Sequence, residues 1–162
     1  MKTISLSAFA LAMLAAQGAG AEDLVARGEY LARIMDCQGC HTTGALAGKP
    51  DPAMHLAGST IGFGIPDVGV MYPPNLTPDR ETGLGSWSDE DLVRAVRTGM
   101  RPDGRQLAPV MPWPSYAALS DADAKALAAY LKSLPAVRHR APPPAGTNGK
   151  PAAPYLSIIT PQ

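Results

Sequence analysis

The sequence is poor in aromatic side chains, cysteine and net charge, and each shortage narrows what the protein can be. Only 6% of the residues are aromatic although 46% are hydrophobic, so a core made of protein alone contains few large side chains. Lys and Arg number 14, as do Asp and Glu, and this neutral balance gives no reason to expect nucleic acid or an anionic membrane as a partner. The length of 162 residues favours one domain.

Both cysteines lie in one pentapeptide, Cys-Gln-Gly-Cys-His, at residues 37–41. This C-x-x-C-H spacing is the signature of covalent c-type haem attachment. The thiols of Cys37 and Cys40 can each form a thioether with a haem vinyl group, and the imidazole of His41 can then bind the iron. A haem also supplies the apolar bulk that the aromatic-poor core lacks, so we expect folding to depend on it.

Two other kinds of site use a similar spacing of cysteines. A structural zinc ion needs four ligands, and beyond His41 the chain has only His55 and His139 and no further cysteine. A thioredoxin-like redox pair does not need the histidine and lies beside a βαβ pattern, which is absent here. The pentapeptide therefore favours one covalently attached haem c.

The N-terminus has the pattern of a secretory signal peptide. Lys2 gives a short positive region, Ile4–Ala16 is an apolar run, and Ala19–Ala21 matches the small-x-small cleavage pattern. The run is short for a transmembrane helix, which favours a cleaved signal peptide; retention as an uncleaved anchor is the alternative. We expect cleavage after Ala21, a mature chain that starts at Glu22 without a membrane span, and export to the periplasm.

Three segments have helical periodicity, at about residues 23–35, 89–98 and 121–133. Ser88, with Asp91 three residues later, resembles a capping box, and Gly99 suits the C-terminal end of the same helix. Gly28 lies in the middle of the first helix, where it costs up to about 1 kcal/mol relative to Ala. This glycine indicates that another helix, the last one, crosses closely there.

The rest of the chain is rich in Pro and Gly, which predicts loops and short extended structure. Prolines around Met111 force an extended path, so this methionine has no periodic core face and is the best-placed candidate for a second iron ligand. Met100 is the alternative methionine. His55 is a further alternative ligand, but a hydrogen-bonded or surface role is favoured. Candidates for lining the pocket or binding haem propionates are Pro50, Tyr72, Asn75, Trp87, Arg105, Trp113 and Tyr116.

Residues 136–162 form a tail rich in Pro and Ala, which we expect to be extended or disordered. Its one apolar patch, Tyr155–Ile159, is expected to dock on the domain or on a partner.

The segment from Asp23 to Pro135 resembles a single-haem class I cytochrome c. The resemblance rests on the pentapeptide at 37–41 and on three further features, namely Gly28 with Tyr30, Met111-Pro112, and Leu127-x-x-Tyr130-Leu131. More narrowly, three stretches are similar to the cytochrome c subunits of bacterial periplasmic dehydrogenases: Pro-Asn-Leu-Thr-Pro-Asp at 74–79, and residues 82–92 and 97–104. Many such subunits have three haem modules, whereas this chain has one haem motif.

The resemblance implies an all-α class I cytochrome c fold, in which a few helices and long loops of residues 22–135 surround one haem. It implies that His41 and Met111 are the axial iron ligands, and that the protein is an electron carrier without catalytic residues of its own. The implied donor is a periplasmic dehydrogenase subunit, and the implied acceptor is another cytochrome or a terminal oxidase. Two alternatives are a haem enzyme or gas sensor with an open distal site, and a structural subunit that tethers a dehydrogenase through the tail.

Overall fold

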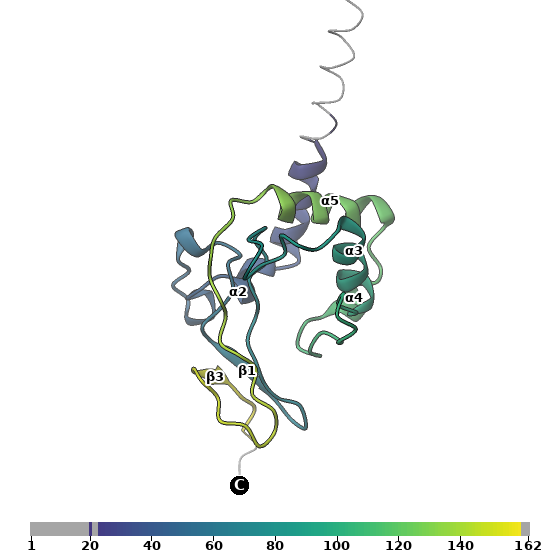
Figure 1. Cartoon of the computed structure of the whole chain (residues 1–162). Helices are drawn as coiled ribbons and strands as arrows, with labels where there is room; N and C mark the ends of the chain where they lie inside the picture. The colour runs from purple at the N-terminus through teal and green to yellow at the C-terminus, as the bar shows by residue number, and fades with distance from the viewer. Residues whose placement is uncertain (1–19, 21–22, 160–162) are drawn as a thin grey trace, which may run out of the picture.

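A computed structural model describes residue 20 and residues 23–159 (Figure 1). A first helix covers residues 23–34. The other elements, in chain order, are α2 (Cys37–His41), the 3-10 turns η1 (Ala45–Ala47) and η2 (Pro52–Met54), strands β1 (Gly62–Ile65) and β2 (Gly69–Met71), helices α3 (Asp89–Thr98), α4 (Trp113–Tyr116) and α5 (Asp121–Ser133), and strand β3 (Tyr155–Leu156). Figure 1 shows α3, α4 and α5 gathered at one end, with the strands at the other.

The ends of α3 follow directly from its sequence. Ser88 accepts a hydrogen bond from the backbone N–H of Asp91, whose carboxylate accepts one from the N–H of Ser88, so the predicted capping box is confirmed. Three acidic residues in the first turn suit the helix dipole. Gly99 ends the helix with a φ of 71°, a left-handed conformation that favours glycine.

The core lies between the helices and is built mainly from leucine and alanine. Helix α5 begins at the Ser120 cap and packs against α3. Buried side chains of this core are Ala32, Leu56, Leu84, Leu92, Leu127, Ala128, Tyr130 and Leu131. Small residues let the helices approach closely, which agrees with the low aromatic content of the sequence.

The first helix crosses α5 at Gly28, as the sequence predicted. A Cβ atom on Gly28 would lie 2.6 Å from the Cβ of Tyr130 and would collide with the backbone carbonyl oxygen of Ala126. A backbone oxygen cannot move aside cheaply, so only glycine permits this approach. The crossing is supported at its edge by an ion pair of 2.9 Å between Arg27 and Asp123.

A small three-stranded sheet completes the fold, and the all-α prediction did not include it. Its strand order is β2-β1-β3; β1 and β2 are antiparallel, whereas β1 and β3 are parallel. Each strand has only two to four residues, too few to show an alternating pattern. The partner β3 also comes from the far end of the sequence. The three predicted helices are therefore present, and the sheet is an addition to them. The extended path predicted around Met111 is wrong, because residues 109–111 form a turn and helix α4 follows at once, with Pro114 in its first turn, where a proline is tolerated.

The segment after α5 is extended and ordered, and it returns from the helices to the sheet (Figure 1). Val70 and Ala145 exchange two backbone hydrogen bonds, of 2.7 and 2.9 Å. The hydroxyl of Tyr72 donates to the carbonyl oxygen of Ala153 at 2.6 Å. Residues 136–156 therefore lie against the body of the protein, although they have almost no helix or strand of their own. Of the predicted apolar patch, Tyr155 and Leu156 pair with β1, whereas Ile158 and Ile159 are 85% exposed.

Two sequence predictions fall on the ends of the chain. The signal peptide predicted for residues 1–21 lies outside the described residues, except for Gly20, as do residues 160–162 of the tail. Within the part that the structure describes, no helix is both long enough and apolar enough to cross a membrane.

The crossing at Gly28 gives a direct test of the packing. Gly28→Ala is expected to lower the free energy of unfolding by about 2 kcal/mol, because overpacking outweighs the gain of up to about 1 kcal/mol in helix propensity. Guanidinium titration of the haem-loaded protein measures this loss. Gly146→Ala is the matched control, since a Cβ at Gly146 meets no atom within 4 Å. Equal stability of the two variants would contradict the close crossing.

Candidate functional site

Helix α2 places the two cysteines and the histidine of the pentapeptide on one short turn. Asp36, which precedes the helix, has a left-handed φ of 52°, so the chain turns sharply between the first helix and α2. Residues three and four positions apart share one face of a helix, so Cys37 lies on the same face as Cys40 and His41. The two cysteines are not joined in a disulfide; Cys37 is buried and Cys40 is half-buried.

Burial favours the protonated form of both thiols. Burial raises the pKa of Cys37 to about 11, and the nearby charge of Asp36 adds to the rise. Burial also raises the pKa of Cys40, again with a contribution from Asp36. Reactive redox cysteines have depressed pKa values, so this environment does not fit a thioredoxin-like pair.

His41 is buried and its ring orientation is fixed by one hydrogen bond. Its Nδ1 lies 2.8 Å from the carbonyl oxygen of Pro74, which can only accept, so Nδ1 carries the proton and donates. Burial lowers the pKa of His41, and the hydrogen bond to Pro74 opposes that effect in part. The ring is therefore a neutral imidazole whose Nε2 has a free lone pair, the form that binds metals.

The C-terminal end of α2 is also tied to the loop that follows η2. The backbone N–H of Gly58 donates to the carbonyl oxygen of His41 at 2.8 Å. The N–H of Leu56 donates to the buried hydroxyl of Thr42 at 3.0 Å. These two bonds fix the backbone of His41 independently of its side chain.

Met111 is half-buried and lies on residues 99–112, the segment between α3 and α4, most of whose other residues are exposed (the methionine segment). Its N–H donates to the carbonyl oxygen of Ala108 at 2.9 Å, and its own carbonyl accepts from the N–H of Trp113 at 2.8 Å. The ring of Trp113 fills the space beside Gly99, and the N–H of Leu107 donates to the Gly99 carbonyl at 2.7 Å. The methionine segment is therefore fastened to the end of α3 on one side and continues into α4 on the other.

Tyr116, at the end of α4, links the methionine segment to the start of the pentapeptide. Its hydroxyl donates to the carbonyl oxygen of Met35 at 2.9 Å. Burial raises the pKa of Tyr116 to about 12, with further contributions from Cys37, Cys40 and Asp36. The helix that follows Met111 thus lies against the beginning of α2. Direct pairing of Met111 with His41 stays a prediction.

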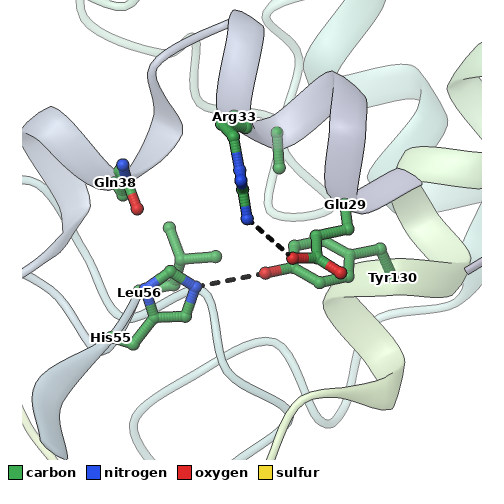
Figure 2. A pocket seen from close by; sticks show the side chains of 7 residues that line it. Glu29, Arg33, Gln38, His55, Leu56 and Tyr130 are labelled. Carbon is green, nitrogen blue, oxygen red and sulfur yellow. Dashed lines mark hydrogen bonds and ion pairs between the residues drawn. The ribbon is translucent and has the colours of Figure 1, made fainter. Parts of the chain in front are cut away.

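The alternative ligand candidates have other partners or settings. The Nε2 of His55 and the hydroxyl of Tyr130 form a hydrogen bond of 3.1 Å, beside an ion pair between Glu29 and Arg33 (Figure 2). The hydrogen-bonded role predicted for His55 is therefore confirmed. Met100 is exposed and pairs through its backbone with Gln106.

Most of the predicted pocket and propionate candidates are engaged within the protein. Asn75 is bonded to the backbone of the C-terminal segment, and Arg105 is paired with Asp103 at 2.7 Å. Arg101 lies over the ring of Trp87, 5.4 Å from its centroid. Sequence patterns did not reveal the partners of Asn75, because those partners are backbone carbonyls far along the chain.

The arrangement fits a covalently attached haem. Cys37 and Cys40 on one face of a short helix are followed at once by a neutral, oriented imidazole, and these are the groups that bind such a cofactor. A small helical protein with this site is a haem protein of the c type.

Comparison with known proteins also indicates a haem protein of the c type. The family model described as Cytochrome c matches residues 25–135, and the chain belongs to this family. Family membership implies a covalently bound haem c and a role in electron transport.

Curated relatives are named as subunits of bacterial dehydrogenases. The chain is 43% identical over 110 residues to the cytochrome c subunit of quinone alcohol dehydrogenase of Gluconobacter oxydans, a match that covers 68% of this chain and 21% of the relative. It is 43% identical over 111 residues to the gluconate 2-dehydrogenase cytochrome c subunit of Pantoea cypripedii, covering 67% and 22%. It is 40% identical over 108 residues to the fructose dehydrogenase cytochrome subunit of Gluconobacter japonicus, covering 66% and 20%. The chain thus spans about a fifth of the length of these relatives.

The bond from Tyr116 to Met35 predicts a pH-dependent contribution to stability. At neutral pH, Tyr116→Phe is expected to lower the free energy of unfolding by about 1 kcal/mol, the usual contribution of one hydrogen bond. Because the folded protein raises the phenol pKa from 10 to about 12, this stability is fully present below pH 10 and is lost as the pH rises through about 12.

Urea titration of both proteins at pH 7 and at about pH 11 measures the effect. The difference in stability between parent and variant is expected to narrow at the higher pH. Tyr30→Phe is the control, because the ring of Tyr30 is exposed. A difference that stays constant across this pH range would show that the Tyr116 hydroxyl does not act in this way.

Proposed function

We propose that the protein is a periplasmic electron carrier with one haem c attached through Cys37 and Cys40, and with His41 and Met111 as the axial iron ligands. The bound haem supplies one-electron chemistry, because its iron cycles between the ferrous and ferric states. The observation that carries the proposal is the imidazole of His41, buried and fixed by the Pro74 carbonyl, which leaves Nε2 for the iron.

Met111 is the second ligand in this proposal because of its setting. It is half-buried, its backbone is hydrogen-bonded on both sides, and α4 continues from it to the contact between Tyr116 and Met35. Met100 is exposed and lies before this segment. A methionine thioether favours the reduced iron and raises the reduction potential.

Two protein ligands suit electron transfer better than catalysis. With both His41 and Met111 as ligands, a bound haem would offer no free iron position to a substrate. The remaining contribution of the protein is then to hold the two ligands rigidly and to keep water out. The hydrogen bonds of the His41 ring and of its backbone carbonyl serve the first purpose for that ligand.

The same proposal covers the organisation of the chain. Residues 1–21 are a signal peptide that is removed on export, residues 22–135 have the class I cytochrome c fold, and residues 136–162 are the C-terminal tail. Export to the periplasm agrees with haem c, which is attached outside the cytoplasm.

A periplasmic dehydrogenase is the proposed electron donor, and another cytochrome or a terminal oxidase is the proposed acceptor. The support for the donor is that three relatives are named as cytochrome subunits of alcohol, gluconate and fructose dehydrogenases.

Ligation by Met111 can be tested by spectroscopy. The ferric protein is expected to show the weak charge-transfer band of iron–methionine ligation, to lose it completely in Met111→Ala, and to keep it in Met100→Ala. The opposite pattern would assign the ligand to Met100. Rapid binding of carbon monoxide by the untreated reduced protein would favour a haem enzyme or gas sensor with an open distal site.

The proposed donor can be tested by purification of the native protein under mild conditions. A flavin, quinoprotein or molybdenum catalytic subunit is expected to co-purify, and its substrate is expected to reduce the haem in the complex. Met111→Ala is expected to co-purify equally well, because docking does not depend on the iron ligand. It is expected to be reduced more slowly, because the methionine thioether favours the reduced iron. A native complex without any dehydrogenase subunit would contradict this donor.

A further inference from the structure

The C-terminal segment passes directly beside the loop whose carbonyl orients His41. The point of contact is Asn75, the residue after Pro74, which is 1% exposed. Its side-chain amide donates to the carbonyl oxygen of Val137 at 2.7 Å and lies 3.3 Å from that of His139. The loop residue and the C-terminal segment are thus joined through a buried amide, where hydrogen bonds are strong.

Thr77 extends this contact to the other end of the Asn75 side chain. The amide oxygen of Asn75 accepts from both the backbone N–H and the hydroxyl of Thr77, at 2.9 and 2.8 Å. The Thr77 hydroxyl in turn accepts from the N–H of Val137 at 3.1 Å. Both polar ends of the Asn75 side chain are therefore bonded, and Val137 contributes its N–H and its carbonyl to the same network.

A second contact lies on the neighbouring segment of the site. The Nδ1 of His139 and the carbonyl oxygen of Ala57 form a hydrogen bond of 2.7 Å. Ala57 precedes Gly58, whose N–H donates to the carbonyl oxygen of His41. Residues 137–139 thus contact both loops that hold His41, one at its side chain and one at its backbone.

The covalent geometry makes the Asn75 contact relevant to the imidazole. The carbonyl of Pro74 and the N–H of Asn75 belong to one planar peptide unit, so a fixed Asn75 also fixes the direction of the carbonyl. That carbonyl oxygen is the acceptor 2.8 Å from the Nδ1 of His41. A displacement of Asn75 therefore lengthens or bends the bond to the ring.

We propose that Asn75, held by residues 137–139 of the C-terminal segment, is a positioning residue for His41, and that through the Pro74 carbonyl it sets the reduction potential of the haem. This inference rests on the proposed role of His41 as an iron ligand. Residues 137–139 lie beyond residues 25–135, the part that the family model matches, so this control of the ligand comes from outside the matched domain.

The direction of the effect follows from the chemistry of imidazole ligands. A strong hydrogen bond from Nδ1–H to a carbonyl makes the ligand more basic. A more basic ligand stabilises the ferric state and lowers the reduction potential. Loosening Asn75 weakens the bond, so it is expected to raise the potential.

Asn75→Ala and Thr77→Val, made in the full-length haem-loaded protein, test the proposal. Both are expected to raise the midpoint potential by up to about 59 mV. At a fixed applied potential, this shift corresponds to a rise of up to about tenfold in the ratio of reduced to oxidised protein. In NMR spectra of the reduced protein, the Nδ1–H proton of His41 is expected to exchange with solvent faster than in the parent. The iron–methionine band is expected to remain, because the other axial side is untouched.

Arg138→Gln is the matched control on the same stretch of chain. It removes an ion pair with Glu81 of 2.6 Å, in which the arginine side chain is 74% exposed, and it leaves the Asn75 contacts in place. Its potential and its exchange rate are expected to equal those of the parent. A purely structural role for Asn75 would lower stability without moving the potential, and that result would overturn the proposal.

Two further results complete the test. Thr77→Val keeps the volume of the side chain, so it decides the matter alone if Asn75→Ala does not fold; an unchanged potential in this variant rejects the proposal. Iron-shifted ring resonances of His41 in the ferric parent report ligation separately. If they are missing, the proposed function fails, whereas unchanged potentials with these resonances present reject only the positioning role.

Discussion

The hydrogen bond from the Nδ1 of His41 to the carbonyl of Pro74 is the interaction on which the rest of the site depends. A buried imidazole needs a partner for its N–H, because an unsatisfied polar group in an apolar environment costs about 1–3 kcal/mol. The partner also decides which nitrogen remains free. One bond thus satisfies the ring, fixes its tautomer and directs Nε2 away from Pro74. In the proposed function, that nitrogen binds the iron.

The surrounding structure holds the His41 ring and the Pro74 carbonyl at hydrogen-bonding distance. The ring comes from α2, whose backbone is held by Gly58 at one end and whose start lies against Tyr116 of α4. The helices themselves approach closely because Gly28 has no side chain at the crossing with α5. A core of leucine and alanine permits this closeness, and a haem supplies the bulk that aromatic side chains supply elsewhere. Both the low aromatic content and the glycine at the crossing therefore allow the helices to pack closely.

Local chemistry decided which of these features could be predicted from the sequence. The capping box at Ser88, the left-handed end at Gly99 and the glycine at the crossing each depend on a few neighbouring residues, and the structure has all three. The parallel pairing of β1 with β3 and the bond from Asn75 to Val137 join segments that are far apart in the sequence. Their acceptors are backbone carbonyls, which every residue has, so no residue pattern indicates them.

The C-terminal segment is part of the folded body of the protein. Composition alone predicted an extended or disordered tail after the domain, because proline and alanine form no periodic apolar face. The acceptors for Asn75 are the carbonyl oxygens of Val137 and His139. They lie in residues 136–141, a stretch without proline between Pro135 and residues 142–144, and no helix uses these carbonyls. The prolines restrict the backbone only at the two ends of the stretch, so the hydrogen bonds to the buried Asn75 and Thr77 hold the residues between them. The order of this segment therefore comes from its contacts with the body of the protein, which composition does not reveal.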